Sequence, residues 1–279
     1  MGFTRSWATL GEYLTSGHLA DRWKGVFEGI DRFVLFMGYP RSGHSLLGSI
    51  LDAHPEALLA HEQDILRYLK YGFGRERLLA LLMRNSMRTA QKGRDWSGYS
   101  YRLPEQYQGT YRHLRVIGDK KGANSTRRLA QDPDLLHRLE EKVGLPLRII
   151  HVIRDPLDNV SRMALWAMDE KKGQAPDKET LRASMDEYFF LADTIQKIRQ
   201  KGWNTCFVDL QLENLLREPR RNLSVLQEKV GLGQEEEHLQ AASGLLFDSP
   251  KRASEEVNWP EELERELQDR VKGYDFLKR

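Results

Sequence analysis

Residues 33–45 read FVLFMGYPRSGHS, an apolar run followed by a loop that contains two glycines. The first five residues predict a buried strand, because the run is short and a glycine follows it. Residues 45–53 are apolar at helical spacing, which predicts a helix directly after the loop. From Gly38 to Ser45 the spacing is that of a phosphate-binding loop, G-x-x-x-x-G-K-[ST]. Backbone N–H groups in such a loop, together with the N-terminus of the next helix, bind an anion.

One position of this loop departs from the pattern. His44 stands where the pattern has a lysine, and in nucleoside triphosphatases that lysine contacts the β- and γ-phosphates. Arg41, inside the loop, supplies a cation in its place. The loop therefore predicts a phosphate or sulfate ligand, and His44 itself is expected to be a polar residue at the start of the helix.

Apolar runs alternate with helical patterns along the rest of the chain. Strands are predicted at 57–60, 114–118, 145–153 and 204–210, and helices at 62–70, 75–91, 124–130, 133–142, 157–169, 178–200 and 260–272. This alternation predicts an α/β fold of the P-loop type, in which a central parallel sheet lies between two layers of helices. No linker rich in Pro, Gly or Ser divides the chain, so we expect one domain over residues 1–279, with 1–30 as a helical N-terminal arm.

Composition excludes several classes of protein. The 279 residues include 43 Lys plus Arg and 41 Asp plus Glu, a net charge of +2, so a nucleic-acid partner is not expected. The single cysteine, Cys206, excludes an internal disulfide and a multi-cysteine zinc site. No apolar run reaches the roughly 18–20 residues of a membrane span, and the first residues lack the apolar centre of a signal peptide. We expect a cytoplasmic protein without a membrane span.

The loop resembles the first nucleotide-binding loop of sulfotransferases that use 3′-phosphoadenylyl sulfate (PAPS). Their pattern, P-[KR]-S-G-[ST]-[ST], fits residues 40–45 at five of six positions. LDAHP at 51–55, followed by His61 and Glu62, is similar to the tyrosylprotein sulfotransferases and their bacterial relatives. The resemblance implies that the nucleotide is bound by Pro40, Arg41, Ser42, Gly43, His44, Ser45 and Leu46.

A second phosphate-binding element is expected after the strand predicted at 145–153. There the resemblance assigns the 3′-phosphate of the nucleotide to Arg154, at the strand end, and to Ser161, on the next helix. Ser161 lies seven residues after Arg154, whereas the serine of the family usually lies eight residues after the arginine, a position that Arg162 holds here. A surface ion pair of Arg154 with a neighbouring aspartate is the alternative.

Two further segments bear on nucleotide binding. Leu212 stands where the family usually has an aromatic residue that helps to hold the adenine, so another ring must serve, and the sequence does not identify it. Lys251 and Arg252 form a basic pair near the C-terminus that the resemblance assigns to the 3′-phosphate. A solvated basic pair is the alternative. Residues 93–111, rich in tyrosine, are expected to be irregular. Together with the residues near 166–188 they are expected either to shape a pocket for an aromatic or lipid-like alcohol or only to pack.

Four residues are candidates for the chemistry. Glu62, after the strand predicted at 57–60, takes by resemblance the position of a catalytic glutamate. A glutamate serves as a base near neutral pH only if burial raises its pKa, and His61, which titrates there without such a shift, is the rival. The resemblance implies that Lys120 approaches the leaving oxygen between sulfate and phosphate, with Lys121 as the alternative, and a lysine there stabilises developing negative charge. Arg41 is the fourth candidate, as the cation of the loop.

These observations predict a PAPS-dependent O-sulfotransferase. In-line transfer of a sulfuryl group from PAPS to an acceptor hydroxyl yields a sulfate ester and adenosine 3′,5′-bisphosphate, with cationic side chains in place of a metal. One alternative is a P-loop kinase or nucleotide phosphohydrolase, with Asp209 as its Walker B aspartate. Another is a non-catalytic nucleotide-binding protein of the same fold. The sequence does not identify the acceptor.

Overall fold

The computed structural model describes residues 2–96, 98–168, 175–246 and 252–278. The main strands are β1 (Arg32–Gly38), β2 (Ala57–His61), β5 (Val116–Lys120), β6 (Leu147–Ile153) and β7 (Phe207–Gln211). Within the described ranges these five strands form one parallel sheet in the order β2-β5-β1-β6-β7. A small antiparallel hairpin consists of β3 (Asp95–Trp96) and β4 (Tyr99–Ser100).

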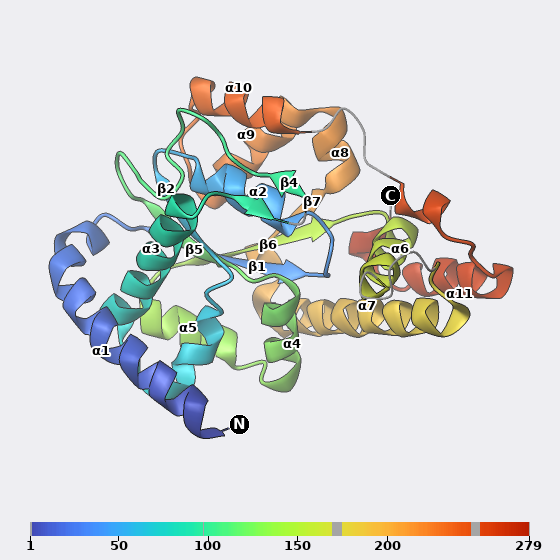
Figure 1. Ribbon diagram of the computed structural model, residues 1–279, viewed down its shortest axis with the longest axis horizontal. Coiled ribbons are helices and arrows are strands. Elements are labelled where there is room, and N and C mark those ends of the chain that lie inside the picture. Colours follow the sequence, from blue (N-terminus) through green and yellow to red (C-terminus); the bar gives the residue numbers. More distant parts are fainter. Residues whose placement is uncertain (1, 97, 169–174, 247–251, 279) are drawn as a thin grey trace.

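Helices cover both faces of the sheet (Figure 1). They are α1 (Gly2–Phe27), α2 (His44–Asp52), α3 (Arg75–Gln91), α4 (Ala123–Gln131), α5 (Leu135–Val143), α6 (Pro156–Ala167), α7 (Lys178–Ile198), α8 (Leu212–Arg217), α9 (Pro219–Val230), α10 (Glu236–Leu245) and α11 (Glu261–Val271). α1, α3, α4, α5 and α7 lie on one face, and α2, α8, α9 and α10 lie on the other. The predicted three-layer α/β fold with a central parallel sheet is confirmed.

The strand β1 shows why the sheet is buried on both sides. Phe33 and Leu35 belong to one apolar core and Val34 and Phe36 to the other, because successive side chains of a strand point to opposite faces. All four are fully buried. A strand in the middle of such a sheet therefore reads as a continuous apolar run, which is the pattern of residues 33–37.

Three elements beside the site differ from the sequence-based expectation. One is the β3–β4 hairpin, which lies in the stretch 93–111 that was expected to be irregular. β5 runs to Lys120, two residues beyond the predicted end, because β2 pairs with it as far as His61. The helix expected at 62–70 begins only at Ile65 and is a 3₁₀ helix as far as Tyr71. The backbone between β2 and this helix instead forms a turn, with Glu62 at a φ of 59°.

At the N-terminus, α1 is a single helix that packs against α3, and its last residue, Phe27, is buried in the core. Within the described ranges, no helix has both the length and the hydropathy needed to cross a membrane.

Candidate active site

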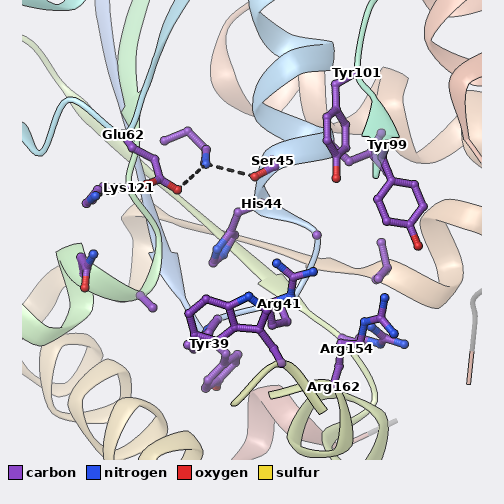
Figure 2. A pocket seen from close by; sticks show the side chains of 18 of the residues that line it. Tyr39, Arg41, His44, Ser45, Glu62, Tyr99, Tyr101, Lys121, Arg154 and Arg162 are labelled. Carbon is purple, nitrogen blue, oxygen red and sulfur yellow. Dashed lines mark hydrogen bonds and ion pairs between the residues drawn. The ribbon is translucent and has the colours of Figure 1, made fainter. Parts of the chain in front are cut away.

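A pocket of about 450 Å³ opens at the carboxyl ends of the central strands (Figure 2). Ligands of parallel α/β sheets bind at this edge. The loop between β1 and α2 forms the pocket floor, since Pro40, Arg41, Gly43, His44, Ser45 and Leu46 all line it. Of the seven loop residues predicted to bind the nucleotide, Ser42 alone is absent from this lining. It is buried, and its hydroxyl donates a hydrogen bond of 3.0 Å to the carbonyl oxygen of Tyr39.

The loop depends on a glycine at position 43. Gly43 caps α2 with a φ of 101°, a left-handed conformation that favours glycine. A Cβ there would also lie 3.3 Å from Leu212 Cδ1. The loop therefore closes tightly onto the start of α2, where backbone N–H groups are available to an anion.

His44 is a buried, neutral residue rather than a substitute for the missing lysine. Burial first, and then the nearby Lys120 ammonium, lower the pKa of His44 to about 3. Its ring occupies a slot between two glycines: a Cβ on Gly38 would lie 2.9 Å from Nε2, and one on Gly122 would lie 2.3 Å from Nδ1. His44 thus supports the loop without carrying charge, as expected for a polar residue at the helix start.

Besides Arg41, a second cation reaches the loop from another strand. Lys120, at the end of β5, donates from Nζ to Ser45 Oγ at 3.1 Å and to Glu62 Oε1 at 3.0 Å. Its stem runs along Gly48 of α2, where a Cβ would lie 2.8 Å from Lys120 Cγ. Lys121 Nζ contacts the second oxygen of Glu62, Oε2, at 3.2 Å. Both carboxylate oxygens of Glu62 therefore bind an ammonium group.

The pKa of Glu62 is lower than the sequence analysis required. Burial raises this pKa, but the Lys120 ammonium and its hydrogen bond, with Lys121, outweigh burial and bring the pKa to about 2. The expectation that burial would bring it toward neutrality is wrong, because the side chain is still 47% exposed and lies between two lysines. In this arrangement Glu62 is ionised at neutral pH.

The rival base, His61, is not brought into the pocket. It precedes Glu62 at the end of β2 and does not line the cavity. Burial, followed by the charge of Lys120, lowers the pKa of His61 to about 3. The idea that His61 titrates near neutral pH is therefore wrong for this structure.

A buried aspartate holds the turn that presents Glu62. Asp119 accepts backbone N–H bonds from Gln63 at 3.1 Å and from Ile65 at 2.8 Å. The N–H group of Glu62 donates to the carbonyl oxygen of Lys120 at 3.1 Å. These bonds stabilise the left-handed backbone at Glu62. The sequence analysis did not find this role of Asp119, because it depends on two strands that are far apart in the chain.

Arg154 and Arg162 lie on the opposite side of the pocket from Glu62, and Arg41 of the loop lies between them and Glu62 (Figure 2). Arg154 is at the end of β6, and Arg162 is two turns into α6. Ser161 is turned away, because its Oγ donates to the carbonyl oxygen of Leu157 at 2.7 Å and accepts from the indole N–H of Trp259 at 2.8 Å. One residue rotates a helix by about 100°. The expected contact of Ser161 with the nucleotide is thus corrected: Arg162, eight residues after Arg154, faces the pocket.

Of the basic pair near the C-terminus, the structure describes Arg252 alone. Arg252 does not line the cavity, and it forms a surface ion pair of 3.7 Å with Glu255. Lys251 lies outside the described residues.

Three lining residues escaped the sequence analysis: Tyr39, Asn124 and Arg127. Tyr99, Tyr101 and Trp166 also line the pocket, and they lie in the stretches 93–111 and 166–188 that were candidates for a pocket wall. The spacing of eight residues was the one local signal for Arg162. Within the described ranges, no cluster of three or more His, Cys, Asp or Glu is arranged to hold a metal ion.

Comparison with known sequences decides the family. The sequence pattern of the sulfotransferase family matches residues 34–236, which include the phosphate loop, Glu62, Lys120 and Arg154. The chain belongs to the sulfotransferase family. It is therefore a sulfotransferase-family enzyme. Comparison with curated protein sequences finds no match.

Solved structures of sulfotransferases share the fold. The sulfotransferase domain of the olefin synthase from Synechococcus PCC 7002 is 15% identical, with a TM-score of 0.54 over 88% of this chain and 96% of that one. The sulfotransferase domain from the curacin biosynthetic pathway is 14% identical, with a TM-score of 0.55 over 88% and 99%. Sulfotransferase STF9 from Mycobacterium avium is 14% identical, with a TM-score of 0.53 over 96% and 83%. At these identities the likeness shows the fold alone, and the finer likeness to tyrosylprotein sulfotransferases stays a prediction.

Proposed function

We propose that this sulfotransferase transfers the sulfuryl group of PAPS to an acceptor hydroxyl. The observation that carries the proposal is the division of the pocket into two cationic regions. Arg41 and Lys120 flank the phosphate loop, while Arg154 and Arg162 lie at the end of β6 and on α6. A nucleotide with phosphates at both the 3′ and 5′ positions fits two such regions.

Each part of the donor has a candidate partner. The loop N–H groups, Arg41 and Ser45 bind the 5′-phosphosulfate. Arg154 and Arg162 bind the 3′-phosphate, because a planar guanidinium donates two parallel hydrogen bonds to one phosphate. Membership of the family supports PAPS as the donor.

The transfer itself requires a base and a partner for the leaving group. The acceptor oxygen attacks sulfur as its proton passes to Glu62, while the bond between sulfur and the bridging oxygen breaks and its electron pair goes to the departing phosphate. Lys120 stabilises that developing charge. The products are a sulfate ester and adenosine 3′,5′-bisphosphate.

Lys120 connects donor binding to the base. Its ammonium contacts Glu62 and Ser45 at nearly equal distances, so a donor anion in the loop competes with Glu62 for the same ammonium. When Lys120 turns to the donor, one oxygen of Glu62 becomes available to an acceptor hydroxyl. Donor binding then raises the pKa of Glu62, which improves it as a base.

A kinase or phosphohydrolase is less well supported. Asp209 lies on β7 but outside the pocket lining, and its carboxylate is bound by His151 at 2.8 Å and by Arg199 at 2.5 Å. It therefore acts in a side-chain network rather than as a Walker B aspartate.

Thermal unfolding with two ligands tests the proposal. Adenosine 3′,5′-bisphosphate at 100 times its dissociation constant adds about 2.7 kcal/mol to stability, whereas ATP with magnesium should have little effect. Stabilisation by ATP and magnesium alone would favour the kinase. Turnover is then followed as PAPS consumption with a panel of alcohols and phenols. Binding of the bisphosphate without turnover of any acceptor would favour the non-catalytic alternative.

A further inference from the structure

The pocket has a deep part and a mouth that differ in exposure to solvent. Lys120 and Arg154, which the proposed function assigns to the donor, are 3% and 8% exposed. Four lining residues are exposed or partly exposed, and we call them the pocket mouth: Glu62, Asn124, Arg127 and Trp166. Because the donor occupies the deep part, an acceptor that reaches Glu62 from solvent lies against the mouth.

Two helices provide most of the mouth. Asn124 and Arg127 belong to α4 and Trp166 belongs to α6, and both helices pack against α7 (Figure 1). Arg127 is bound to α7 directly, since its Nε donates to Glu187 Oε1 at 2.7 Å. A molecule in the mouth therefore meets side chains from both helices as well as the carboxylate of Glu62.

The Asn124 amide is held in one orientation. Arg127 Nη1 donates to Asn124 Oδ1 at 2.6 Å, which uses the amide oxygen and leaves the two N–H donors of the amide for a ligand. The carboxylate of Glu62, by contrast, can only accept hydrogen bonds while it is ionised. The mouth thus offers both a donor and an acceptor. Hydroxyl groups, which both donate and accept, are complementary to such a pair.

The cations beside the mouth are already paired with carboxylates. Arg127 is paired with Glu187, and Lys121 is paired with Glu62 at 3.2 Å. An acidic acceptor, such as a tyrosine within an acidic peptide, would have to displace these carboxylates. A lipid-like alcohol would cover Asn124 and Arg127 without replacing their hydrogen bonds to water, which costs free energy. A neutral acceptor with several hydroxyl groups meets neither cost.

Trp166 adds an apolar surface to this polar mouth. It lies one helical turn beyond Arg162, lines the pocket and is 61% exposed. The face of an aromatic ring carries partial negative charge, which attracts the C–H groups on one face of a sugar ring. A sugar can therefore cover the indole while its hydroxyl groups stay free to bind polar side chains. Resting on the proposed function, we propose that the acceptor is a neutral sugar that stacks on Trp166 and is bound by Asn124.

The reacting group in this assignment is a ring hydroxyl at Glu62. Its oxygen forms the new bond to sulfur, and its proton passes to the Glu62 carboxylate. The bond between sulfur and the bridging oxygen of PAPS breaks, and its electron pair leaves with adenosine 3′,5′-bisphosphate. The product is the sulfate ester of the sugar.

Consumption of PAPS with acceptors of different chemistry tests the class of acceptor. The neutral sugars are the methyl glycosides of glucose, galactose and mannose. Octanol represents the lipid-like alcohols, and a tyrosine flanked by glutamates represents the acidic peptides. We expect at least one glycoside to have a higher kcat/KM than both octanol and the peptide. If octanol or the peptide exceeds all three glycosides, the assignment is wrong.

Substitutions in the mouth test the two contacts. Loss of one neutral hydrogen bond or one aromatic contact weakens binding about 2- to 10-fold. Asn124→Ala and Trp166→Leu should each raise KM for the best glycoside by such a factor and KM for octanol by less than about twofold. Trp166→Phe retains an aromatic face and should keep most of the affinity. Gln131→Ala is the matched control, because it changes an exposed residue of α4 outside the pocket.

The outcomes separate the acceptor from the reaction. An unchanged KM for the glycoside in either variant overturns the assignment, as does an equal rise for octanol, which would show a structural role. The phenol p-cresol ionises more readily than an alcohol, so it reports transfer without the contacts of the mouth. Turnover of p-cresol but of no glycoside refutes the sugar acceptor and leaves the proposed function standing. If no acceptor consumes PAPS, the proposed function itself fails.

Discussion

Replacing Glu62 with glutamine should change catalysis and nucleotide binding in opposite directions. Glu62→Gln keeps the size of the side chain and one oxygen that can accept from Lys120, but it cannot take a proton from the acceptor. Loss of a general base lowers turnover by about 10²–10⁴-fold. Donor binding should improve, because Glu62 competes with the donor for Lys120.

The gain in binding can be worked from the contact itself. Glu62 Oε1 and Lys120 Nζ are 3.0 Å apart, and Glu62 is half-exposed, so the dielectric constant of water is the suitable choice. Coulomb's law then gives about 1.4 kcal/mol, which corresponds to about a tenfold lower dissociation constant. Glu62→Gln should thus bind adenosine 3′,5′-bisphosphate up to about tenfold more tightly.

Calorimetry measures the affinity, and single-turnover consumption of PAPS measures the chemical step. An aliphatic alcohol is the most decisive acceptor, because an acidic phenol ionises without a base. His61→Gln is the matched control, since His61 neighbours Glu62 and does not line the pocket. The reasoning is refuted if Glu62→Gln turns over as fast as wild type, or if it binds the bisphosphate more weakly.

Because the pKa of Glu62 is about 2, kcat/KM of the wild type should show no acidic limb from this residue between about pH 5 and 8.

Three other predictions concern the remaining parts of the site. Arg154→Ala should abolish the preference for adenosine 3′,5′-bisphosphate over adenosine 5′-monophosphate, while Ser161→Ala keeps it; a lost preference in Ser161→Ala would restore the original assignment. Arg94 and Asp52 form a buried ion pair, so Arg94→Met leaves Asp52 without its partner, and chemical denaturation should show a loss of about 3–5 kcal/mol. Burial raises the pKa of Asp119 to about 7, so its stabilising contribution is present below the unfolded value near 3.8 and is lost as pH rises through 7. Asp119→Asn should flatten that part of the curve of unfolding free energy against pH, and an unchanged curve would contradict the assignment.

Much of the fold can be predicted from patterns within single short segments of the sequence. The helix 75–91 and the strand at 33–37 follow from apolar spacing within one segment, and the structure has α3 at Arg75–Gln91 and β1 at Arg32–Gly38. The loop between β1 and α2 is equally local, because its glycine spacing and the elements on either side are contiguous in the chain. Hydrophobic periodicity is a property of residues that are close together in the sequence, so it predicts helices and strands without knowledge of the tertiary structure.

The electrostatics of the site depend on residues that are distant in the chain. The pKa of Glu62 could not be derived from its own segment, because Lys120 and Lys121 reach it only when β2 pairs with β5. Burial of a single glutamate predicts a raised pKa, whereas two ammonium groups beside it reverse the sign. Charges interact through space, so the pKa depends on the distances between Glu62 and the two lysines. Those distances follow from the strand order, which cannot be predicted from any single segment of the sequence.

The direction in which side chains point from a helix or loop was the second feature that the sequence did not predict. Ser161 and Arg162 are adjacent in sequence, but the turn of α6 directs one toward Trp259 and the other into the pocket. Tyr101 reaches the pocket because the buried pair of Arg94 and Asp52 holds the β3–β4 hairpin on α2. A pattern of residue types predicts that such groups exist near a site, but the direction in which each side chain points depends on packing between elements that are remote in the chain.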